Sequence, residues 1–392
     1  MKPAVSIRKS RLIHKLGNMF FIPKAYYLLI GFFCIIPFVV SAQDQKLADS
    51  LFHVYRQDNL KGTARLELLR NLAFNEVKDL NRALQYAEEL ISLSAAEKNY
   101  LYLHRGYFQK GNKKRLFGDL DEALDAYFKS MEYAKKANFV TGEGTAYGAI
   151  GDIFSISNNH RNAMLYYNKA IETLRKANDP ISLASAISNA GDEFLNNKLY
   201  DSAHRYFSES GRIFEKANYL NGKAYSLGNI GMVYANQGKN SMAEKNINEA
   251  IKLLEEQEDY YPICVYLISM SDIYLEKGDK QTAGSYAMRS LNLAQRYQLK
   301  EQIGDANLKL SVLYEKAGNI GQSFKYYKNH IAYRDSVNNI KSVQKMADLR
   351  TDFEVSQKQA EVDLLNQEKR NQRVVLISVF VILGLTTVLL IT

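Results

Sequence analysis

The side chains that could do chemistry are spread along the chain rather than gathered in catalytic motifs. The six histidines are His14, His53, His104, His160, His204 and His330. No two of them lie four residues apart, and none belongs to an HExxH-type metal-binding arrangement. A structural role is therefore predicted for each histidine. The sequence predicts no catalytic residue, no metal site and no cofactor-binding residue, so the chain as given is not expected to be an enzyme.

A glycine-rich segment, TGEGTAYG, contains Gly142, Gly144 and Gly148. Glycine-rich loops bind phosphate when they follow a strand and open a helix. Here no strand is predicted before the segment, and the segment lies where a helix is expected to begin. Close packing of helices is therefore favoured over phosphate binding.

Acidic residues recur at a constant interval, as Asp152, Asp192 and Asp272. Their spacing is one or two multiples of forty residues, which indicates that they occupy the same position in successive structural units. Packed helices lie about 8–10 Å apart, so carboxylates one unit apart do not converge on a single catalytic centre. They are predicted to form a ladder of local hydrogen bonds or to line a groove.

Seven windows of forty residues account for this interval and organise most of the chain. They begin at Asn71, Gly111, Gly151, Gly191, Gly231, Ser271 and Ser311. An aromatic residue follows three positions later in six of them, at Phe74, Phe154, Phe194, Tyr234, Tyr274 and Tyr314, whereas Lys114 is the exception. A tiny residue stands twelve positions in, at Ala83, Ala123, Ala163, Ala203, Ala243, Ala283 and Ser323. Position sixteen is usually aromatic or Ile, at Tyr127, Tyr167, Phe207, Ile247 and Tyr327.

Spacings of three and four residues place these side chains on one helix face. The middle of five windows contains a residue suited to ending a helix, at Gly118, Asn158, Gly238, Gly278 and Gly318. Between windows, the segments KKAN, RKAN and EKAN end at Asn138, Asn178 and Asn218, where a left-handed cap is predicted. Pro180 is expected to stop the helix that precedes it. Each window thus predicts two helices, and pairs that cannot bury their apolar faces alone must stack into a solenoid.

This pattern of a small residue, an aromatic at plus three, Ala at plus twelve and an aromatic at plus sixteen resembles the tetratricopeptide repeat (TPR) family. The usual repeat has about 34 residues, and the repeat of this chain is longer. The resemblance covers about two thirds of the chain. It implies an all-α, right-handed superhelix of helix pairs, here a seven-repeat array over residues 59–335 preceded by a cap over residues 43–58.

The resemblance also implies that the first helix of each pair lines a concave groove that binds peptides or partner proteins. By register, the candidate groove residues are Asn112, Asp152, Asp192, Leu195, Asn196, Asn236, Asp272 and Glu276. Asn196 and Asn236 could bond an extended peptide backbone, although each polar residue could instead only solvate the surface. The cation set of TPR proteins that clamp a C-terminal carboxylate is not matched, so such a ligand is not expected.

The net charge of +9 does not indicate nucleic-acid binding. Residues 1–42 contain six of the 51 Lys and Arg residues and no acid, which leaves 51 − 6 = 45 cations against 42 acids, a charge of +3. A near-neutral solenoid lacks the basic surface that nucleic acid requires.

Residues 1–42 are typical of a signal peptide or of an N-terminal anchor. A basic stretch precedes an apolar run over residues 25–40, and Val40-Ser41-Ala42 fits a small-residue cleavage site. Both interpretations place the repeats outside the cytoplasm, so a bacterial inner-membrane protein with a periplasmic array is expected. Cys34 lies in this segment outside any lipoprotein motif. After cleavage only Cys264 would remain, so no intramolecular disulfide is expected.

The C-terminal part is predicted to be one linker helix over residues 336–373 followed by a transmembrane helix over residues 374–392. The linker approximates a heptad seam, so it could form a parallel coiled coil and a homodimer, or it could be a solvated helix that caps the solenoid. The last segment carries no charge and is long enough to span a bilayer core. A longer protein that continues past Thr392 into a cytoplasmic segment is expected.

Two functions fit this layout. A signal peptide, a periplasmic TPR array, a helical linker and one transmembrane helix resemble the sensor half of bacterial TPR-containing membrane signalling proteins, whose output domain is a histidine kinase, a nucleotide cyclase or a DNA-binding domain. The alternative is a membrane-tethered TPR scaffold that assembles a complex and does not signal. A catalytic domain beyond Thr392 would favour the receptor, and a short basic tail would favour the scaffold.

Overall fold

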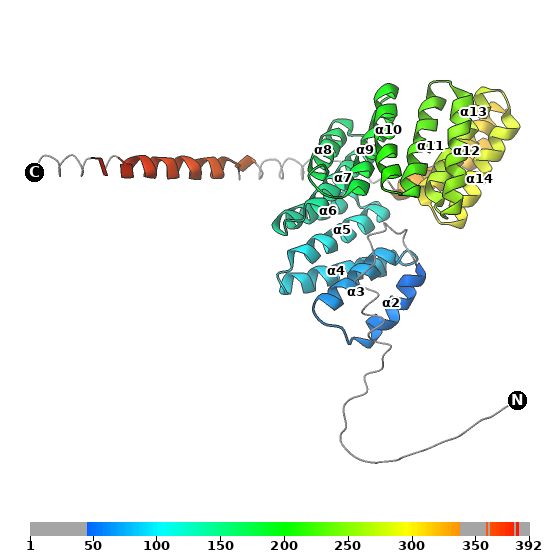
Figure 1. Cartoon of the computed structure of the whole chain (residues 1–392). Helices are drawn as coiled ribbons and strands as arrows, with labels where there is room; N and C mark the ends of the chain where they lie inside the picture. The colour runs from blue at the N-terminus through cyan, green and yellow to red at the C-terminus, as the bar shows by residue number, and fades with distance from the viewer. Residues whose placement is uncertain (1–44, 338–357, 360, 380–381, 384–392) are drawn as a thin grey trace, which may run out of the picture. The chain divides into compact units, whose positions relative to one another are not determined.

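The computed structural model describes residues 45–337, 358–359, 361–379 and 382–383, and the regular structure in these residues is helical. Within the described residues, the helix α2 (Gln45–Gln57) precedes seven helix pairs (Figure 1). The pairs are α3 (Thr63–Asn75) with α4 (Leu80–Ala96), α5 (Tyr100–Phe117) with α6 (Leu120–Lys136), α7 (Val140–Ile156) with α8 (His160–Leu174), α9 (Pro180–Asn196) with α10 (Tyr200–Lys216), α11 (Leu220–Asn236) with α12 (Asn240–Glu256), α13 (Tyr260–Glu276) with α14 (Lys280–Arg296), and α15 (Lys300–Lys316) with α16 (Ile320–Val337). The first helix of each pair is called the A helix and the second the B helix.

Most of the described helices end just before a residue in the left-handed backbone conformation. Gly118 has φ 83° and Asn158 has φ 55°, and the following N–H reaches back to a carbonyl of the last helical turn, as Asn159 N–H does to Phe154 O at 2.8 Å. This bonding satisfies carbonyls that the helix itself leaves open. The predicted mid-window turns at Gly118, Asn158, Gly238, Gly278 and Gly318 are confirmed, as are the left-handed caps at Asn138 and Asn218.

The predicted cap at Asn178 is wrong. α8 ends earlier, at Leu174, and Asn178 is not among the residues with positive φ. Pro180 does not stop the preceding helix but is the first residue of α9, where its missing N–H costs no hydrogen bond. Asp179 caps this helix by accepting the backbone N–H of Ser182 at 3.0 Å.

The A helices lie on the inner side of the array and the B helices on the outer side. Among the described helices, successive A helices contact one another, as α7 does α9 and α11 does α13. Successive B helices of the described array make no such contacts. Helices that approach closely on one side and diverge on the other curve the stack, so the A helices line its concave surface. The all-α TPR-like solenoid predicted from the repeat is confirmed.

Small residues of the A helices receive large residues of the B helix in the same pair. A Cβ added at Gly151 would lie 2.6 Å from Tyr167 Cε1, and one added at Gly191 would lie 2.7 Å from Phe207 Cε1. The tiny residues at window position twelve, from Ala83 to Ala283, are fully buried. The aromatic at position sixteen thus fills the space within a pair, where a Cβ on the A helix would exclude it.

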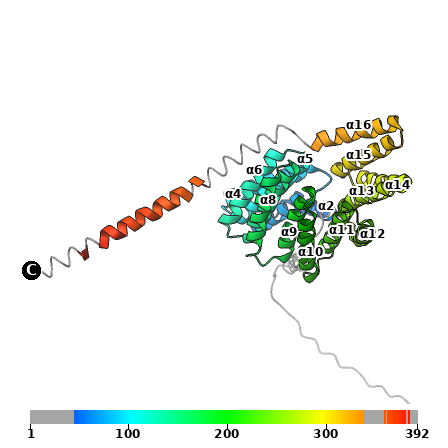
Figure 2. The ribbon, with the colours of Figure 1, turned by 90° about the horizontal axis from the view of Figure 1, so that it is seen from above.

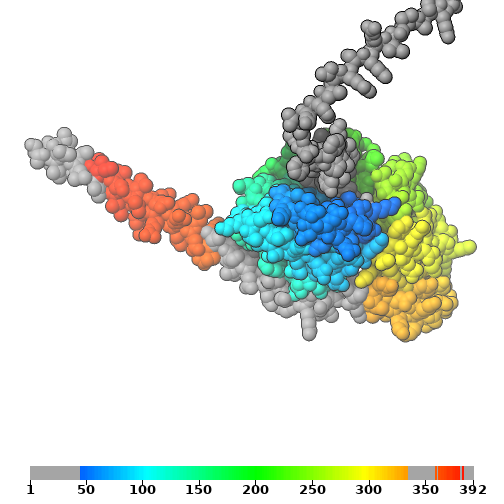
Figure 3. Space-filling view, turned by 90° about the horizontal axis from the view of Figure 1, so that it is seen from below, coloured from blue at the N-terminus to red at the C-terminus, as the bar shows by residue number. Residues whose placement is uncertain are grey.

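The last pair departs from this burial pattern. Phe324 is 68 % exposed and Tyr327 is 47 % exposed on α16, whereas the residue equivalent to Tyr327 in α10, Phe207, is fully buried. α16 also returns to contact α5, far earlier in the chain (Figure 2). Figure 3 shows the first helices in blue and cyan and α16 in orange on one face of the molecule.

Several predicted segments lie wholly or partly outside the described residues. These include the targeting segment 1–42 and residues 338–357 of the predicted linker. Residues 361–379 are helical, but residues 380–381 and 384–392 of the predicted transmembrane segment are outside the description. In the described parts of the chain, none of the helices combines the length and the apolar character that a membrane span requires.

Candidate ligand-binding face

A stripe of partly exposed side chains runs along the A helix α9. On α9 it consists of Ser185, Asn189, Asp192 and Asn196, while most residues between them are buried. Intervals of four, three and four residues place all of them on one side of a helix. Equivalent positions recur at forty-residue intervals on the A helices from α5 to α15, although Gln109, Ala149 and Asn229, which correspond to Asn189, are buried. Together these positions make up the surface here called the A-helix face.

Hydrogen bonds between neighbouring A helices cross this face as a ladder. Asn189 Nδ2 donates to Asp152 Oδ1 at 3.0 Å, and Asn229 Nδ2 donates to Asp192 Oδ1 at 3.1 Å. Lys309 Nζ pairs with Asp272 in the same way. Each donor lies 37 residues after its acceptor. The carboxylates therefore do form a ladder of hydrogen bonds, and each of these contacts joins the A helices of two neighbouring pairs.

A buried tyrosine extends the ladder to a third helix pair. The hydroxyl of Tyr266 on α13 lies 2.8 Å from Asn229 Oδ1 and 3.0 Å from Tyr225 O. Because Asn229 donates its amide N–H to Asp192, the contacts join α13, α11 and α9 in sequence. Tyr266 is 1 % exposed, so this part of the network is shielded from water and contributes rigidity to the centre of the face.

The centre of the face carries incompletely compensated negative charge. Burial, with repulsion from the neighbouring carboxylates of Asp152 and Glu193, raises the pKa of Asp192 to about 7. Burial also raises the pKa of Asp152, although the Arg115 guanidinium and the hydroxyl of Tyr167, 2.9 Å away, act against the increase. A carboxylate that is desolvated and has carboxylate neighbours favours a proton or an incoming cation.

The buried carboxylate of Glu193 links α7, α8 and α9 behind the face. Ser155 Oγ donates to it at 2.6 Å, Asn197 Nδ2 lies 3.3 Å from it, and His160 Nδ1 pairs with it. Only 1 % of Glu193 is exposed. With these partners Glu193 and His160 hold neighbouring pairs together, which is a structural role.

The predicted groove residues fall into three classes. Asn112 accepts the hydroxyl of Tyr127 at 2.8 Å, and Asp152, Asp192 and Asp272 belong to the ladder. Asn196, Asn236 and Glu276 are exposed near the C-terminal ends of α9, α11 and α13. Asn236 Nδ2 donates to Met232 O of its own helix at 2.9 Å. Leu195 is the exception, because it is only 8 % exposed and packs with Phe207 and Val233 in the core, so it does not line the face.

Sequence reasoning missed the donors of the ladder. Asn189 and Asn229 are forty residues apart, two positions before the small residue of their windows, so their recurrence was a usable signal. Lys309 stands at the same position but differs in type. The pairing of Lys309 with Asp272 could not be predicted, because it depends on how far neighbouring A helices are shifted along their axes relative to each other.

A cavity of about 420 Å³ opens where the ladder is interrupted, between α11, α13 and α15. Its lining is Met232, Cys264, Val265, Ile268, Ser269, Ser290, Gln302, Asp305, Leu308, Lys309 and Val312. Volumes of about 300–1,000 Å³ with mostly apolar walls and a few polar groups are usual for ligand sites. Among the described residues, no group of three or more His, Cys, Asp or Glu side chains could hold a metal ion.

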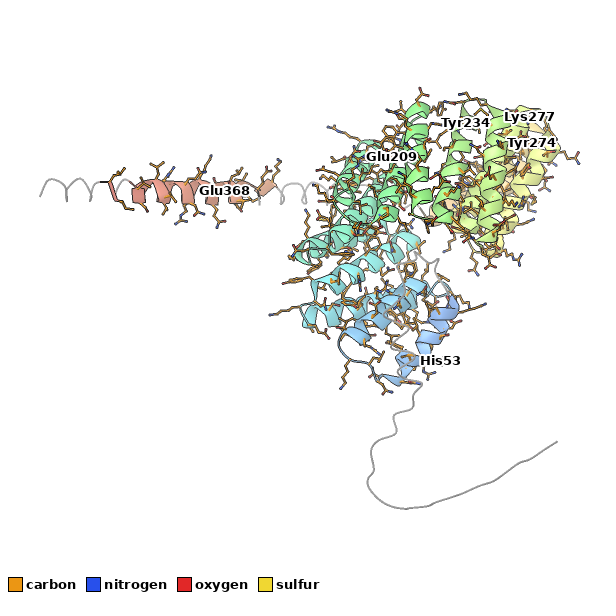
Figure 4. The ribbon with its side chains drawn as sticks, in the orientation of Figure 1. His53, Glu209, Tyr234, Tyr274, Lys277 and Glu368 are labelled. Carbon is orange, nitrogen blue, oxygen red and sulfur yellow. The ribbon has the colours of Figure 1, made fainter. Side chains whose placement is uncertain are left out.

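Aromatic side chains reinforce the outer rim of the same junctions. Tyr234 of α11 and Tyr274 of α13 occupy the same window position, and Figure 4 shows Lys277 close to Tyr274. Lys277 Nζ lies 4.9 Å from the centre of the Tyr274 ring and also pairs with Glu244. These contacts stabilise the packing of the pairs and leave the A-helix face accessible.

Comparisons with known proteins agree with this architecture. The family model described as tetratricopeptide repeat matches residues 144–173 and 224–255. These segments cover α7 with α8 and α11 with α12 almost completely. The search of curated proteins found no match.

Solved structures with the same fold include several Rap proteins. A Rap protein complexed with competence and sporulation factor has a TM-score of 0.61 at 15 % identity, over 77 % of this chain and 82 % of its own. Aspartyl phosphate phosphatase F from Bacillus subtilis has a TM-score of 0.56 at 14 % identity, over 74 % of this chain and 76 % of its own. The Rap conjugation gene regulator of the plasmid pLS20, in complex with the Phr* peptide, has a TM-score of 0.51 at 14 % identity, over 75 % of this chain and 95 % of its own.

At such identities these likenesses show the fold alone. The repeat pattern, the helix pairs and the family match agree with one another and concern the same residues. Two segments of the chain thus match the tetratricopeptide repeat family, and the helix pairs of the described array share the TPR-like fold.

Proposed function

We propose that the A-helix face binds an extended peptide or an extended segment of a partner protein. The observation that carries the proposal is the ladder of polar side chains between successive A helices, Asp152 with Asn189, Asp192 with Asn229 and Asp272 with Lys309, next to one cavity. Helices about 8–10 Å apart place equivalent side chains at intervals of about three extended residues, because a strand rises about 3.3 Å per residue. A peptide that crosses the helices would meet one A helix after another.

Exposed groups at the C-terminal ends of the A helices suit such a ligand. Asn196 and Asn236 offer amide groups, and Glu276 continues the row on α13. The Nδ2 group of Asn236 is engaged with its own helix, which leaves Oδ1 as an acceptor for a peptide N–H. In support, one of the structural neighbours is described as a complex with the Phr* peptide.

A matched pair of triple variants tests this function. The full-length chain would be used to select peptides from a random phage-displayed library, and the affinity of the selected peptides would be measured by calorimetry. Replacing Asn196, Asn236 and Glu276 with alanine should weaken binding about tenfold or more, as loss of polar contacts at an interface does.

The control replaces the same residue types on the outer surface. Asn168→Ala, Asn248→Ala and Glu249→Ala change exposed residues of α8 and α12, and this variant should bind as the unmodified chain does. Equal binding by both triple variants would exclude the A-helix face as the peptide site.

The wider role that we propose is that of the sensory part of a membrane-anchored receptor, with the array outside the cytoplasm. The support is the sequence: a targeting segment over residues 1–42 and an uncharged segment over residues 374–392. In such a receptor a ligand would act by binding two arrangements of the solenoid unequally. Full-length chain expressed in bacteria should sediment with membranes and become protease-sensitive in spheroplasts but not in intact cells. Recovery in the cytoplasmic soluble fraction would contradict the anchored topology.

A further inference from the structure

The cavity between α11, α13 and α15 differs chemically from the rest of the A-helix face. Its walls are apolar on all three helices, with Met232 on α11, Ile268 and Val265 on α13, and Leu308 and Val312 on α15. Deeper polar groups already have partners, since Ser290 Oγ donates to Cys264 O at 2.9 Å. The cavity is therefore a place for an apolar group with a polar rim around it.

The sequence explains why the cavity forms at this junction. Met232 stands forty residues after Asp192, and Val312 stands forty residues after Asp272, so apolar side chains replace the carboxylates of the ladder. Ser269 occupies the position that Asn229 and Lys309 fill in the neighbouring A helices. Its side chain is too short to cross to α11, and the space that a ladder contact would occupy remains open.

The rim of the cavity is acidic on the α15 side. Asp305 lines the cavity and Glu301 lies one helical turn before it. Asp305 is exposed at the rim, but desolvation of its carboxyl against the cavity wall and the Glu301 carboxylate together raise its pKa to about 6, while His330 opposes the increase. Lys309 is the cation in the lining, and it is already paired with Asp272. A cation beside Asp305 would therefore remove repulsion between the two acids.

We propose that this cavity receives a bulky aliphatic or aromatic side chain of the bound peptide, and that a basic residue next to it in the peptide pairs with Asp305 and Glu301. The inference rests on the proposed function and names the ligand chemistry of one subsite. Charge complementarity selects the basic residue, and the apolar walls select its neighbour. The ligand class is thus an extended peptide that carries an apolar residue beside Lys or Arg.

Peptide selection on the full-length chain tests the subsite. The selected peptides should be enriched in Leu, Ile, Met or Phe adjacent to Lys or Arg. Ser269→Phe fills the cavity and should weaken the binding of these peptides about tenfold to a hundredfold, as expected when one large apolar side chain loses its site. Ser241→Phe, at an exposed position of α12, is the matched control and should bind normally.

A second variant guards against misfolding of the first. Leu308 is 38 % exposed on the cavity wall, so Leu308→Ala is compatible with folding and should weaken binding about tenfold.

The contact between Asp305 and the basic residue of the peptide is tested by a double-mutant cycle, in which one change is made in the protein and one in the peptide. Asp305→Asn should weaken a selected peptide up to about fivefold, and should have no effect on the same peptide with its basic residue replaced by Gln.

The outcomes separate this inference from the proposed function. If the triple variant of the A-helix face loses binding while Ser269→Phe and Leu308→Ala keep it, the face binds peptide but the subsite is wrong. Peptides enriched without an apolar–basic pair would also overturn the inference. If the unmodified chain selects no peptide, the proposed function fails and the inference with it.

Discussion

Gly228→Ala should destabilise the fold by about 3 kcal/mol, at the upper end of the usual range for overpacking a core. A Cβ at this position would lie 2.2 Å from Cζ of Tyr266 on the next A helix. Tyr266 is buried and held by its hydroxyl contacts to Asn229 and Tyr225, so its ring cannot move aside without breaking the junction between α11 and α13. Urea unfolding followed by circular dichroism measures the loss.

The array supplies its own control two repeats earlier. Gly148 is the equivalent of Gly228, and the residue equivalent to Tyr266 is Ala186. A Cβ at Gly148 meets nothing within 4 Å. Gly148→Ala should therefore stabilise α7 by about 0.5–1 kcal/mol through helix propensity. In the background Tyr266→Ala, the Gly228→Ala change should lose most of its cost. A similar effect of both alanine substitutions on stability would show that the predicted clash does not occur.

Asp192→Asn should stabilise the fold at pH 8 by about 1–2 kcal/mol and have little effect at pH 4. The pKa of Asp192 is about 7 in the fold against 3.8 without its surroundings, so the fold favours the protonated carboxyl. The contribution of Asp192 to the free energy of unfolding is therefore largest below pH 4, and it decreases as the pH rises toward 7. The shift alone corresponds to about 4 kcal/mol, which is reduced because the side chain is partly exposed and screened by solvent.

The asparagine variant keeps the ladder while removing the charge. Its Oδ1 can still accept the Nδ2 hydrogen of Asn229, so packing at the junction is preserved. Urea unfolding at several pH values should show the difference between variant and unmodified chain growing between about pH 4 and pH 7. The control Asp201→Asn on α10, at an exposed position, should change the free energy of unfolding by no more than about 0.5 kcal/mol. A pH-independent effect at Asp192 would contradict the shifted titration.

The sequence was sufficient to predict the helix pairs because each pair is determined by local and repeated features. Gly118 and Asn158 end helices through their own backbone conformation, and Ala163 and Tyr167 are buried by contacts inside one pair. Both kinds of feature recur every forty residues, so the pattern can be recognised even where one copy of the repeat departs from it. Asn178 shows the limit, because its segment resembles the other caps and yet α8 ends before it.

The candidate site was only partly predictable because it depends on contacts between pairs. The carboxylates of Asp152 and Asp192 were recognised by their interval, but the register could not show that Asn189 and Asn229 reach them from the next helix. Leu195 was misplaced because a shift of one position along a helix turns a side chain by about 100°, from the exposed Asn196 into the core. The cavity forms where Met232 and Ser269 stand at ladder positions and make no ladder contact. A search for residue types that recur does not identify positions where the recurring type is replaced.

The regular spacing of the helices restricts how this protein can change in length. From α5 to α16 each helix begins twenty residues after the last, as at Val140, His160 and Pro180. One residue added inside a helix would rotate everything beyond it by about 100°, and the turns are short and their left-handed residues fixed in place. Gain or loss of a whole forty-residue unit keeps every later helix in phase. Duplication or deletion of entire units is therefore the route by which such an array can lengthen or shorten and still fold.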